Sequence, residues 1–205
     1  MIDRKWGAPI HMHKTEENNE RKRNMKIVYI SGSPRKNSNT DYLLGILKSQ
    51  LGGTIIKLSD YHIESCHACM DCRGKGMCVN NDDMNKIVIP ELLESNVIVL
   101  GSPVYFNNVS SQMKAFMDRT HCLIGFLDNK IGGSIVVGRK YGAESALTAI
   151  NAFFLKHNMI PANRGVSGFA FKSGEIEKDA EAIEDTKKLA KRIIELWEIV
   201  ENENK

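Results

Sequence analysis

The sequence predicts an α/β protein with a parallel sheet that is covered by helices on both faces. From Met25 onward, short β-branched runs alternate with segments whose apolar residues recur at helical spacing, and this alternation repeats five times. Right-handed crossovers between parallel strands place helices on both faces of such a sheet. The chain has 205 residues, of which 42% are hydrophobic and 26% are charged, so it can bury a core without disulfide bonds.

The first three elements are defined by clear signals. Lys26–Ile30 is a β-branched run that ends in Ser-Gly-Ser-Pro, as a buried strand does when it enters a loop. Thr40–Leu51 has apolar residues at helical spacing and ends at two glycines. Thr54–Leu58 predicts the second strand. The next helix begins at Asp82 or Asp83 and runs towards Ser95, and a proline at position 90 must kink or split it.

The second half of the chain repeats the alternation with longer apolar runs. The predicted elements are strand Asn96–Gly101, a helix from Ser110 or Ser111 to Thr120, strand Ile131–Val137, helix Ala143–His157, a fifth strand within Met159–Phe171 and a helix over Glu175–Val200. Five parallel strands predict the order 2-1-3-4-5 of a flavodoxin-like three-layer sandwich. Ligands bind such sheets at the carboxyl ends of the strands, so the loops after strands one, three and four are expected to form a site.

Composition and charge exclude several classes of protein. The formal net charge of +3 is too weak to indicate nucleic acid binding, and no apolar run is long enough to cross a membrane. No apolar secretory segment follows the basic N-terminal residues, so a cytoplasmic location is expected. Residues 1–24 are polar with mixed charges and are expected to form a disordered extension before the domain at 25–205.

The loop after the first strand, Ser31–Thr40, is rich in hydrogen-bond donors. Its sequence SGSPRKNSNT supplies hydroxyl, amide and guanidinium groups from Ser31, Ser33, Arg35, Ser38, Asn39 and Thr40. The positive end of the following helix adds free backbone N–H groups, which together make an anion site. The loop lacks the GxGxxG and GxxxxGK[ST] motifs. We therefore expect a mononucleotide with a single phosphate, the alternative being a polar turn that caps the helix.

Two further loops at the same edge could hold a flat ring. The loop after the third strand contains Pro103, Val104, Tyr105, Phe106 and Asn107. Its two aromatic residues offer flat apolar faces, and its asparagine can bind the edge of a heteroaromatic ring. After the fourth strand, Gly138 and Arg139 supply flexible backbone and positive charge. A positive charge beside a flavin stabilises its reduced anion, so the three loops together favour a flavin over ordinary surface loops.

The strongest motif is a run of four cysteines with the spacing C-x2-C-x2-C-x5-C, formed by Cys66, Cys69, Cys72 and Cys78. Four thiolates in thirteen residues can surround one iron–sulfur cluster, and Gly74 and Gly76 permit the necessary turn. Structural zinc usually joins two separated cysteine pairs, and a redox-active disulfide needs only two of the four. The spacing favours an iron–sulfur cluster and leaves zinc and redox-active or free thiols as alternatives.

The remaining cysteine and the nearby histidine are expected to have no role in chemistry. Cys122 lies outside the motif and is expected to be buried, and His67 is expected to be exposed. The cysteine-rich loop at 62–82 follows the second strand. Because all strands are parallel, we expect this loop to share an edge of the sheet with the ring pocket.

From Met25 onward the chain resembles the iron–sulfur flavoproteins, a branch of the flavodoxin-like NADPH-dependent FMN reductase superfamily. The matching segments are Ser31–Thr40, the four-cysteine run with the Asp-Asp-Met that follows it, Ser102–Phe106 and Gln112–Arg119. The resemblance implies one FMN and one [4Fe-4S] cluster per chain, in a homodimer or homotetramer with the cluster of one subunit near the flavin of a neighbour. It also implies that the donors from Ser33 to Thr40 hold the phosphate, and that Pro103 to Asn107 and the Gly138 loop surround the isoalloxazine.

These features predict an oxidoreductase that passes electrons between a one-electron carrier of the ferredoxin type, or NAD(P)H, and a two-electron acceptor. The cofactors would carry the chemistry, so no side chain is expected to act as a nucleophile or general base. One alternative is an NAD(P)H-dependent FMN or quinone reductase whose cysteines hold structural zinc or stay free. The other is a flavin electron carrier without turnover of its own.

Overall fold

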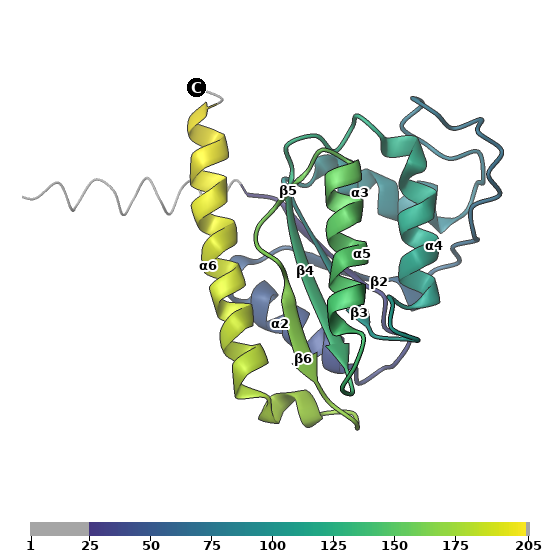
Figure 1. The fold of residues 1–205 in the computed structure, drawn as a ribbon. Helices are drawn as coiled ribbons and strands as arrows, with labels where there is room; N and C mark the ends of the chain where they lie inside the picture. Colours follow the sequence, from purple (N-terminus) through teal and green to yellow (C-terminus); the bar gives the residue numbers. More distant parts are fainter. Residues whose placement is uncertain (1–24, 204–205) are drawn as a thin grey trace, which may run out of the picture.

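In the computed structural model of the protein, which describes residues 25–203, a parallel sheet lies between two layers of helices (Figure 1). Its strand order begins with β2 (Thr54–Lys57), β1 (Ile27–Ser31), β3 (Val97–Pro103) and β4 (Ile131–Gly138). The flavodoxin-like order predicted from the sequence is therefore confirmed. The extension expected at 1–24 lies outside the described residues.

The fifth position of the sheet is shared by two short strands. Both β5 (Ile160–Pro161) and β6 (Val166–Phe169) run parallel to β4. Between them the chain turns at Gly165, whose φ of +106° is open to glycine and strained for other residues. A β-carbon at Gly165 would collide with the hydroxyl oxygen of Ser134, so the chain can pass β4 here only without a side chain. The region predicted to contain one strand is thus interrupted.

The helices divide into two groups, one on each face of the sheet. The first face is covered by α2 (Asn39–Leu51) and α6 (Ala180–Glu203), and the second by α3 (Ile89–Glu94), α4 (Ser111–Arg119) and α5 (Ala143–Lys156). Alternate residues of each strand point into opposite cores, because successive side chains of a strand point to opposite faces. Tyr29 packs with α2 and α6, whereas Ile30 packs with the other three helices.

Several helix boundaries follow the predicted signals. Ser38 caps α2 by accepting a hydrogen bond from the Asp41 N–H at 3.2 Å, and Ser110 caps α4 by accepting from the Met113 N–H at 3.2 Å. The helix that contains Pro90 is split, as predicted, into a π-helical turn at Met84–Val88 and α3, with the proline in the first turn of α3. Short 3-10 turns follow β2 at Leu58–Asp60 and α4 at Thr120–Leu123.

The prediction that the last helix begins at Glu175 is wrong. Glu175–Lys178 forms a separate 3-10 turn, and α6 begins at Ala180. Asp179 between them has a non-helical ψ of 84°, and its carboxylate accepts hydrogen bonds from the N–H groups of Ala182 at 3.0 Å and Phe169 at 2.9 Å. The aspartate therefore caps α6 and ties it to the end of β6. None of the helices that the structure describes combines the length and the apolar run of a membrane-crossing segment.

Candidate functional site

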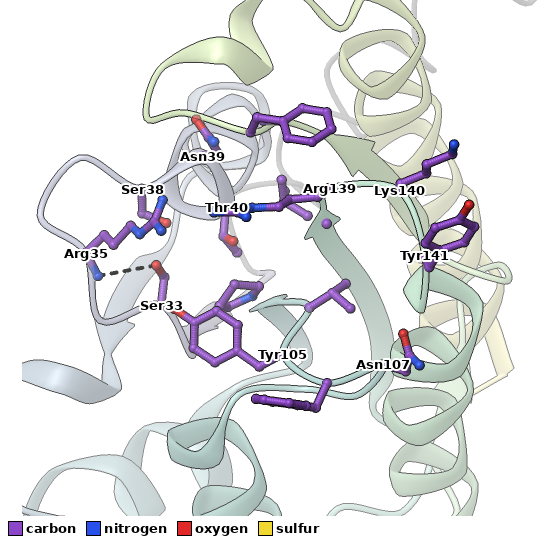
Figure 2. Close-up of a pocket in the computed structure, with 17 residues that line it drawn as sticks. Ser33, Arg35, Ser38, Asn39, Thr40, Tyr105, Asn107, Arg139, Lys140 and Tyr141 are labelled. Atoms are coloured by element: carbon purple, nitrogen blue, oxygen red, sulfur yellow. Dashed lines mark hydrogen bonds between the residues drawn. The ribbon is translucent and has the colours of Figure 1, made fainter.

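A pocket of about 480 Å³ lies at the carboxyl ends of β1, β3, β4 and β6 (Figure 2). Its lining comes from four loops: Ser33, Arg35, Ser38, Asn39 and Thr40; Pro103, Val104, Tyr105, Phe106 and Asn107; Val137, Gly138, Arg139, Lys140 and Tyr141; and Ala170 and Phe171. The structure thus brings together every predicted cofactor-binding residue except Ser31. Every charged residue in this lining is an arginine or a lysine, so the pocket suits an anionic ligand of nucleotide size.

The loop between β1 and α2 presents the first turn of α2 to the pocket. The Ser33 hydroxyl accepts a hydrogen bond from the Arg35 N–H at 3.4 Å, which curls the loop (Figure 2). Arg35 is exposed, and its guanidinium is free to approach a ligand from solvent. The N–H groups at the start of a helix have no partner within the helix and attract anions. A phosphate is the group that this side of the pocket can best hold.

Two residues predicted for this loop take part in structural hydrogen bonds. Ser31 is fully buried at the end of β1, where its hydroxyl donates to Asp41 and its oxygen accepts from the Ser33 N–H. The side-chain amide of Asn39 donates to the Lys172 carbonyl at 2.8 Å and accepts from the Gly174 N–H at 2.8 Å. Ser31 therefore stabilises the loop through hydrogen bonds on the side away from the pocket. Asn39 binds the loop to the segment that follows β6.

An ion pair lies beneath the phosphate-binding side of the pocket. The Nζ of Lys57 on β2 lies 2.6 Å from the carboxylate of Asp41 and also donates to the carbonyl of Arg35. The side chains of Lys57 and Asp41 are only 17% and 24% exposed, so water screens this pair weakly. Lys57 thereby neutralises a carboxylate that would otherwise repel an anion at the start of α2.

The loop after β3 is a strained two-residue turn. Tyr105 and Asn108 exchange both backbone hydrogen bonds, at 2.8 and 3.0 Å, and the two residues between them have positive φ angles of 49° and 60°. This is the geometry of a type I′ turn, which glycine and asparagine normally occupy. Phe106 holds the first strained position with its ring fully exposed. Backbone strain that presents an aromatic ring to a pocket is typical of a binding site.

The loop after β4 closes the far side of the pocket. Tyr141 is 73% exposed, and the Nζ of Lys140 lies 5.3 Å from the centre of its ring. Phe171, which follows β6, adds a second exposed ring. Ala170 and Phe171 were not predicted from the sequence, because the end of the fifth strand was not located. The rule that ligands bind at carboxyl strand ends would have included them once that end was known.

Hydrogen bonds among His62, Cys78, Asp83 and Asn85 hold the two ends of the cysteine loop together, and we call this region its neck. Two cysteines between these ends are exposed. His62 and Asp83 are joined by two hydrogen bonds, from the His62 N–H to the Asp83 carboxylate and from the Asp83 N–H to the His62 carbonyl. Asn85 holds Cys78 in the same way, accepting from its N–H at 2.9 Å and donating to its carbonyl at 2.6 Å. Beyond this neck Cys66 and Cys69 are exposed, whereas Cys72 is buried. These hydrogen bonds, three of which involve the side chains of Asp83 and Asn85, therefore fix one end of the motif before any metal binds.

The thiols of the motif lie within electrostatic range of one another. Burial raises the pKa of Cys72, and the neighbouring charges of Cys78, Cys69 and Cys66 raise it further. Among residues 25–203, however, no three Cys, His, Asp or Glu side chains are gathered closely enough to hold a metal ion. The donor set suits an iron–sulfur cluster in chemistry and spacing, and the exposed half of the loop would have to close around it.

Residues outside the motif behave as expected. His67 is exposed, and Cys122 is fully buried. Burial raises the pKa of Cys122 to about 12, so it stays a protonated, unreactive thiol at neutral pH.

The expectation that the cysteines share an edge with the pocket is wrong within one chain. The loop leaves the pocket edge after β2 but then runs along α4 to the opposite end of that helix (Figure 1). There the Gly76 N–H donates to the Cys122 carbonyl at 3.2 Å, and Arg119 contacts the Glu64 carbonyl at 2.9 Å. The nine residues of α4 place about 13 Å between its two ends.

Comparisons with known proteins agree with the fold. The family model of the NADPH-dependent FMN reductases matches residues 25–174. An iron–sulfur flavoprotein of Methanocaldococcus jannaschii is 36% identical over 192 residues, which cover 86% of this chain and 99% of the relative. An iron–sulfur flavoprotein of Archaeoglobus fulgidus is 34% identical over 200 residues, with 87% and 98% covered.

Solved structures support the same fold at low sequence identity. RosB superposes with a TM-score of 0.68 at 15% identity, covering 87% of this chain and 81% of that one. A WrbA-like flavodoxin of Agrobacterium tumefaciens gives a TM-score of 0.60 at 13% identity, covering 85% and 98%. Together with the family match, these findings show that the chain belongs to the NADPH-dependent FMN reductase family, as an FMN-dependent oxidoreductase of the iron–sulfur flavoprotein branch.

Proposed function

We propose that this protein exchanges electrons between a one-electron carrier and a two-electron acceptor, using FMN in the pocket and a [4Fe-4S] cluster on the cysteine loop. The observation that carries the proposal is the presence, in one chain, of a cationic nucleotide pocket and four neighbouring thiols in thirteen residues. When bound, FMN can exchange two electrons with one partner and single electrons with another, and the cluster handles single electrons.

Different residues of the pocket would bind the phosphate and the ring of FMN. The first turn of α2, with Ser33 and Arg35, would bind the phosphate. Tyr105 and Phe106 would pack against the isoalloxazine, and the exposed ring of Tyr141 would cover it from the opposite loop. The chain's own groups thus bind and orient the cofactor and exclude water from its ring.

The four cysteines Cys66, Cys69, Cys72 and Cys78 would ligate the cluster. Cys78 is already held at the neck and Cys72 is buried, so ligation would draw the exposed Cys66 and Cys69 towards them. The Ala68 N–H already lies 3.4 Å from the Cys66 sulfur, and N–H groups directed at sulfur are favourable in such sites. Ala68 and Met70 both have positive φ angles, which gives this stretch the tight turns that a cluster requires.

A homo-oligomer would bring the two cofactors together. The distance along α4 separates the cysteines of one chain from its own pocket, so electron transfer favours an arrangement in which they face the pocket of a neighbour. Exposed Met70, Met77 and Val79 around the cysteines and exposed Phe106 at the pocket offer apolar surface for such a contact. We propose a homodimer or homotetramer of this kind, with a ferredoxin-like carrier or NAD(P)H as electron donor.

Anaerobic purification followed by absorption spectroscopy and metal analysis tests the proposal. We expect one FMN, about four iron atoms and four sulfides per chain. Cys69→Ala should lose the iron and keep FMN, whereas Cys122→Ala, which removes a buried thiol outside the motif, should keep both. One zinc per chain, or iron that survives in Cys69→Ala, would contradict the cluster assignment.

The electron donor is tested by mixing the oxidised protein with either NADPH or a reduced ferredoxin and following flavin bleaching. Fast reduction by ferredoxin and slow reduction by NADPH would support the one-electron assignment. Fast reduction by NADPH in a cluster-free variant would instead indicate a flavin or quinone reductase. Light scattering at several protein concentrations tests the oligomeric state. A protein that is monomeric and transfers electrons between its cofactors at an undiminished rate would contradict the proposed homodimer or homotetramer.

A further inference from the structure

A buried arginine lies beneath the cysteine loop without belonging to it. Arg119 ends α4, and its side chain is 0% exposed. It forms a two-pronged ion pair with Asp82, with one nitrogen at 2.6 Å and the other at 2.8 Å from the two carboxylate oxygens. Two parallel hydrogen bonds between charged groups fix the guanidinium in position and orientation.

The same guanidinium joins the two ends of the loop. It donates to the carbonyl of Glu64 at 2.9 Å, two residues before the first cysteine of the motif, and to the carbonyl of Asn80 at 3.4 Å, two residues after the last. Asp82 completes the closure, because its carboxylate also accepts from the Glu64 N–H at 3.0 Å and the Met84 N–H at 3.1 Å. Arg119 and Asp82 therefore set the separation of the two ends of the cysteine segment.

One donor of Arg119 has no acceptor among the described residues. Its Nε is buried and makes no hydrogen bond with them, although both of its other nitrogens donate to Asp82. A buried donor without an acceptor is costly, so in a native protein it calls for a binding partner or a functional role. Burial lowers the pKa of Arg119, but its hydrogen bonds with Asp82 and the charges of Cys78 and Asp82 raise it overall. Because the guanidinium also donates to the carbonyl of Asn80, two residues after Cys78, Cys78 is the motif cysteine nearest to this contact along the chain.

We infer that Arg119 is a positioning residue for the cysteine loop, closing its neck and donating its remaining Nε–H to the sulfur of Cys78 when the cluster is bound. This inference rests on the proposed [4Fe-4S] cluster. A reduced cluster carries one more negative charge than an oxidised one. A fixed, buried donor at a ligating sulfur therefore stabilises the reduced form and raises the reduction potential.

Two substitutions in the ion pair should act in opposite directions on the potential. Arg119→Gln removes the positive charge beside Cys78, so the cluster should become harder to reduce. Asp82→Asn removes a negative charge and leaves the arginine, so the cluster should become easier to reduce. Both substitutions weaken the hydrogen bonds that hold the two ends of the loop together. If Arg119 only held these ends together, the reduction potential would shift in the same direction in both variants, or it would shift in neither variant.

The experiment is an anaerobic redox titration of the holoprotein, followed by the electron paramagnetic resonance signal of the reduced cluster. At a fixed ambient potential near the wild-type midpoint, we expect the ratio of reduced to oxidised cluster to fall about tenfold in Arg119→Gln, because a hydrogen bond to a charged group is worth about that factor. Lys114→Gln is the matched control, since it removes one positive charge from the exposed face of the same helix. It should leave the ratio unchanged.

Stability of the loop is measured separately from the potential. Iron release to a chelator should be at least tenfold faster in Arg119→Gln than in Lys114→Gln. In the iron-free protein, hydrogen exchange of the Glu64 N–H should also be faster in Arg119→Gln, since its acceptor Asp82 loses its partner. Bound FMN serves as the measure that each variant is folded.

The outcomes separate this inference from the proposed function. A wild-type protein without iron would overturn the proposed function and the role of Arg119 towards a cluster. A wild-type protein with four iron atoms, together with an Arg119→Gln variant of unchanged potential, would overturn the role towards the Cys78 sulfur alone. Unchanged iron release and unchanged exchange at Glu64 would overturn the closure of the neck.

Discussion

A β-carbon built on Gly142 would lie 2.5 Å from the Cα of Asn107 and 2.6 Å from its side-chain oxygen. The loop after β4 therefore meets the loop after β3 backbone to backbone, at the edge of the pocket. Gly142 also has a φ of +83° and begins α5 directly after the exposed loop at 139–141. This contact fixes the two loops that would enclose the flavin ring relative to each other.

We predict that Gly142→Ala weakens FMN binding at least tenfold. The added methyl group must push the two loops apart, and the positive φ adds backbone strain of about 1–2 kcal/mol. The free energy of unfolding of the flavin-free protein should fall by at least that amount. Flavin fluorescence titration and urea unfolding measure the two effects.

Gly52→Ala is the matched control for this prediction. Gly52 has a similar φ of +76°, but no atom lies within 4 Å of the position that a β-carbon would take there, and it lies at the opposite end of α2 from Asn39 and Thr40 of the pocket lining. Its ψ of −158° lies in a region that essentially only glycine adopts, so the variant should lose about 1–3 kcal/mol of stability through strain alone and keep its affinity for FMN. Equal affinity in Gly142→Ala and Gly52→Ala would show that the loop contact does not matter for binding.

We predict that Phe106→Gly separates stability from binding. Glycine accepts the positive φ of the first turn position, so the flavin-free protein should be as stable as the wild type or slightly more stable. Loss of the exposed ring should weaken FMN binding by about 0.5–1.5 kcal/mol, the usual value of one aromatic contact. Leu155→Ala, which removes an exposed apolar side chain from α5 outside the pocket lining, should leave the affinity unchanged. An affinity that is also unchanged in Phe106→Gly would exclude ring packing.

Strand order and the pocket could be predicted from the sequence because local signals determine them. Buried strands such as Val97–Pro103 are continuous apolar runs, and parallel strands bring their carboxyl ends to one edge whatever the details of packing. The start of α6 could not be predicted, because the capping role of Asp179 depends on a hydrogen bond with Phe169, ten residues away. Contacts between distant segments leave no periodicity in the sequence.

The position of the cysteines shows the same limit. Sheet topology places the beginning of their loop at the pocket edge, and the sequence alone contains nothing that directs it back along α4. That path depends on Arg119, which in the sequence resembles any polar residue at a helix end but is buried by contacts with Glu64 and Asp82. The segment Gln112–Arg119 matches the family, but the match does not indicate which groups Arg119 contacts.

We predict that Lys57→Met weakens binding of FMN about tenfold and leaves binding of riboflavin unchanged. The substitution leaves the Asp41 carboxylate without its cation beside the first turn of α2 and frees the Arg35 carbonyl, and both changes act on the phosphate. Lys114→Met removes an exposed lysine that pairs with Asp118, and it should change neither affinity. If riboflavin binding falls as much as FMN binding, Lys57 supports the whole pocket and not the phosphate side.

The buried His157 should make the protein less stable in mild acid. Burial lowers the pKa of His157 below its ordinary value of 6.5, and its ring packs against Phe153 and contacts the Thr120 hydroxyl at 2.9 Å. Above pH 6.5 the histidine is neutral in both the folded and the unfolded chain. As the pH falls from 6.5 towards the lowered pKa, the unfolded chain binds the proton first, and folding stability is lost.

Urea unfolding at about pH 7.5 and about pH 5.5 measures this loss, and His157→Gln should reduce it, because glutamine cannot bind the proton. The variant will be less stable than the wild type at the higher pH, since it loses the ring contact with Phe153, so the test is the difference between the two pH values in each protein. His62→Gln, which removes a histidine with a 76% exposed side chain, should keep the wild-type difference. A pH-dependent loss of equal size in His157→Gln and the wild type would assign the acid sensitivity to other groups.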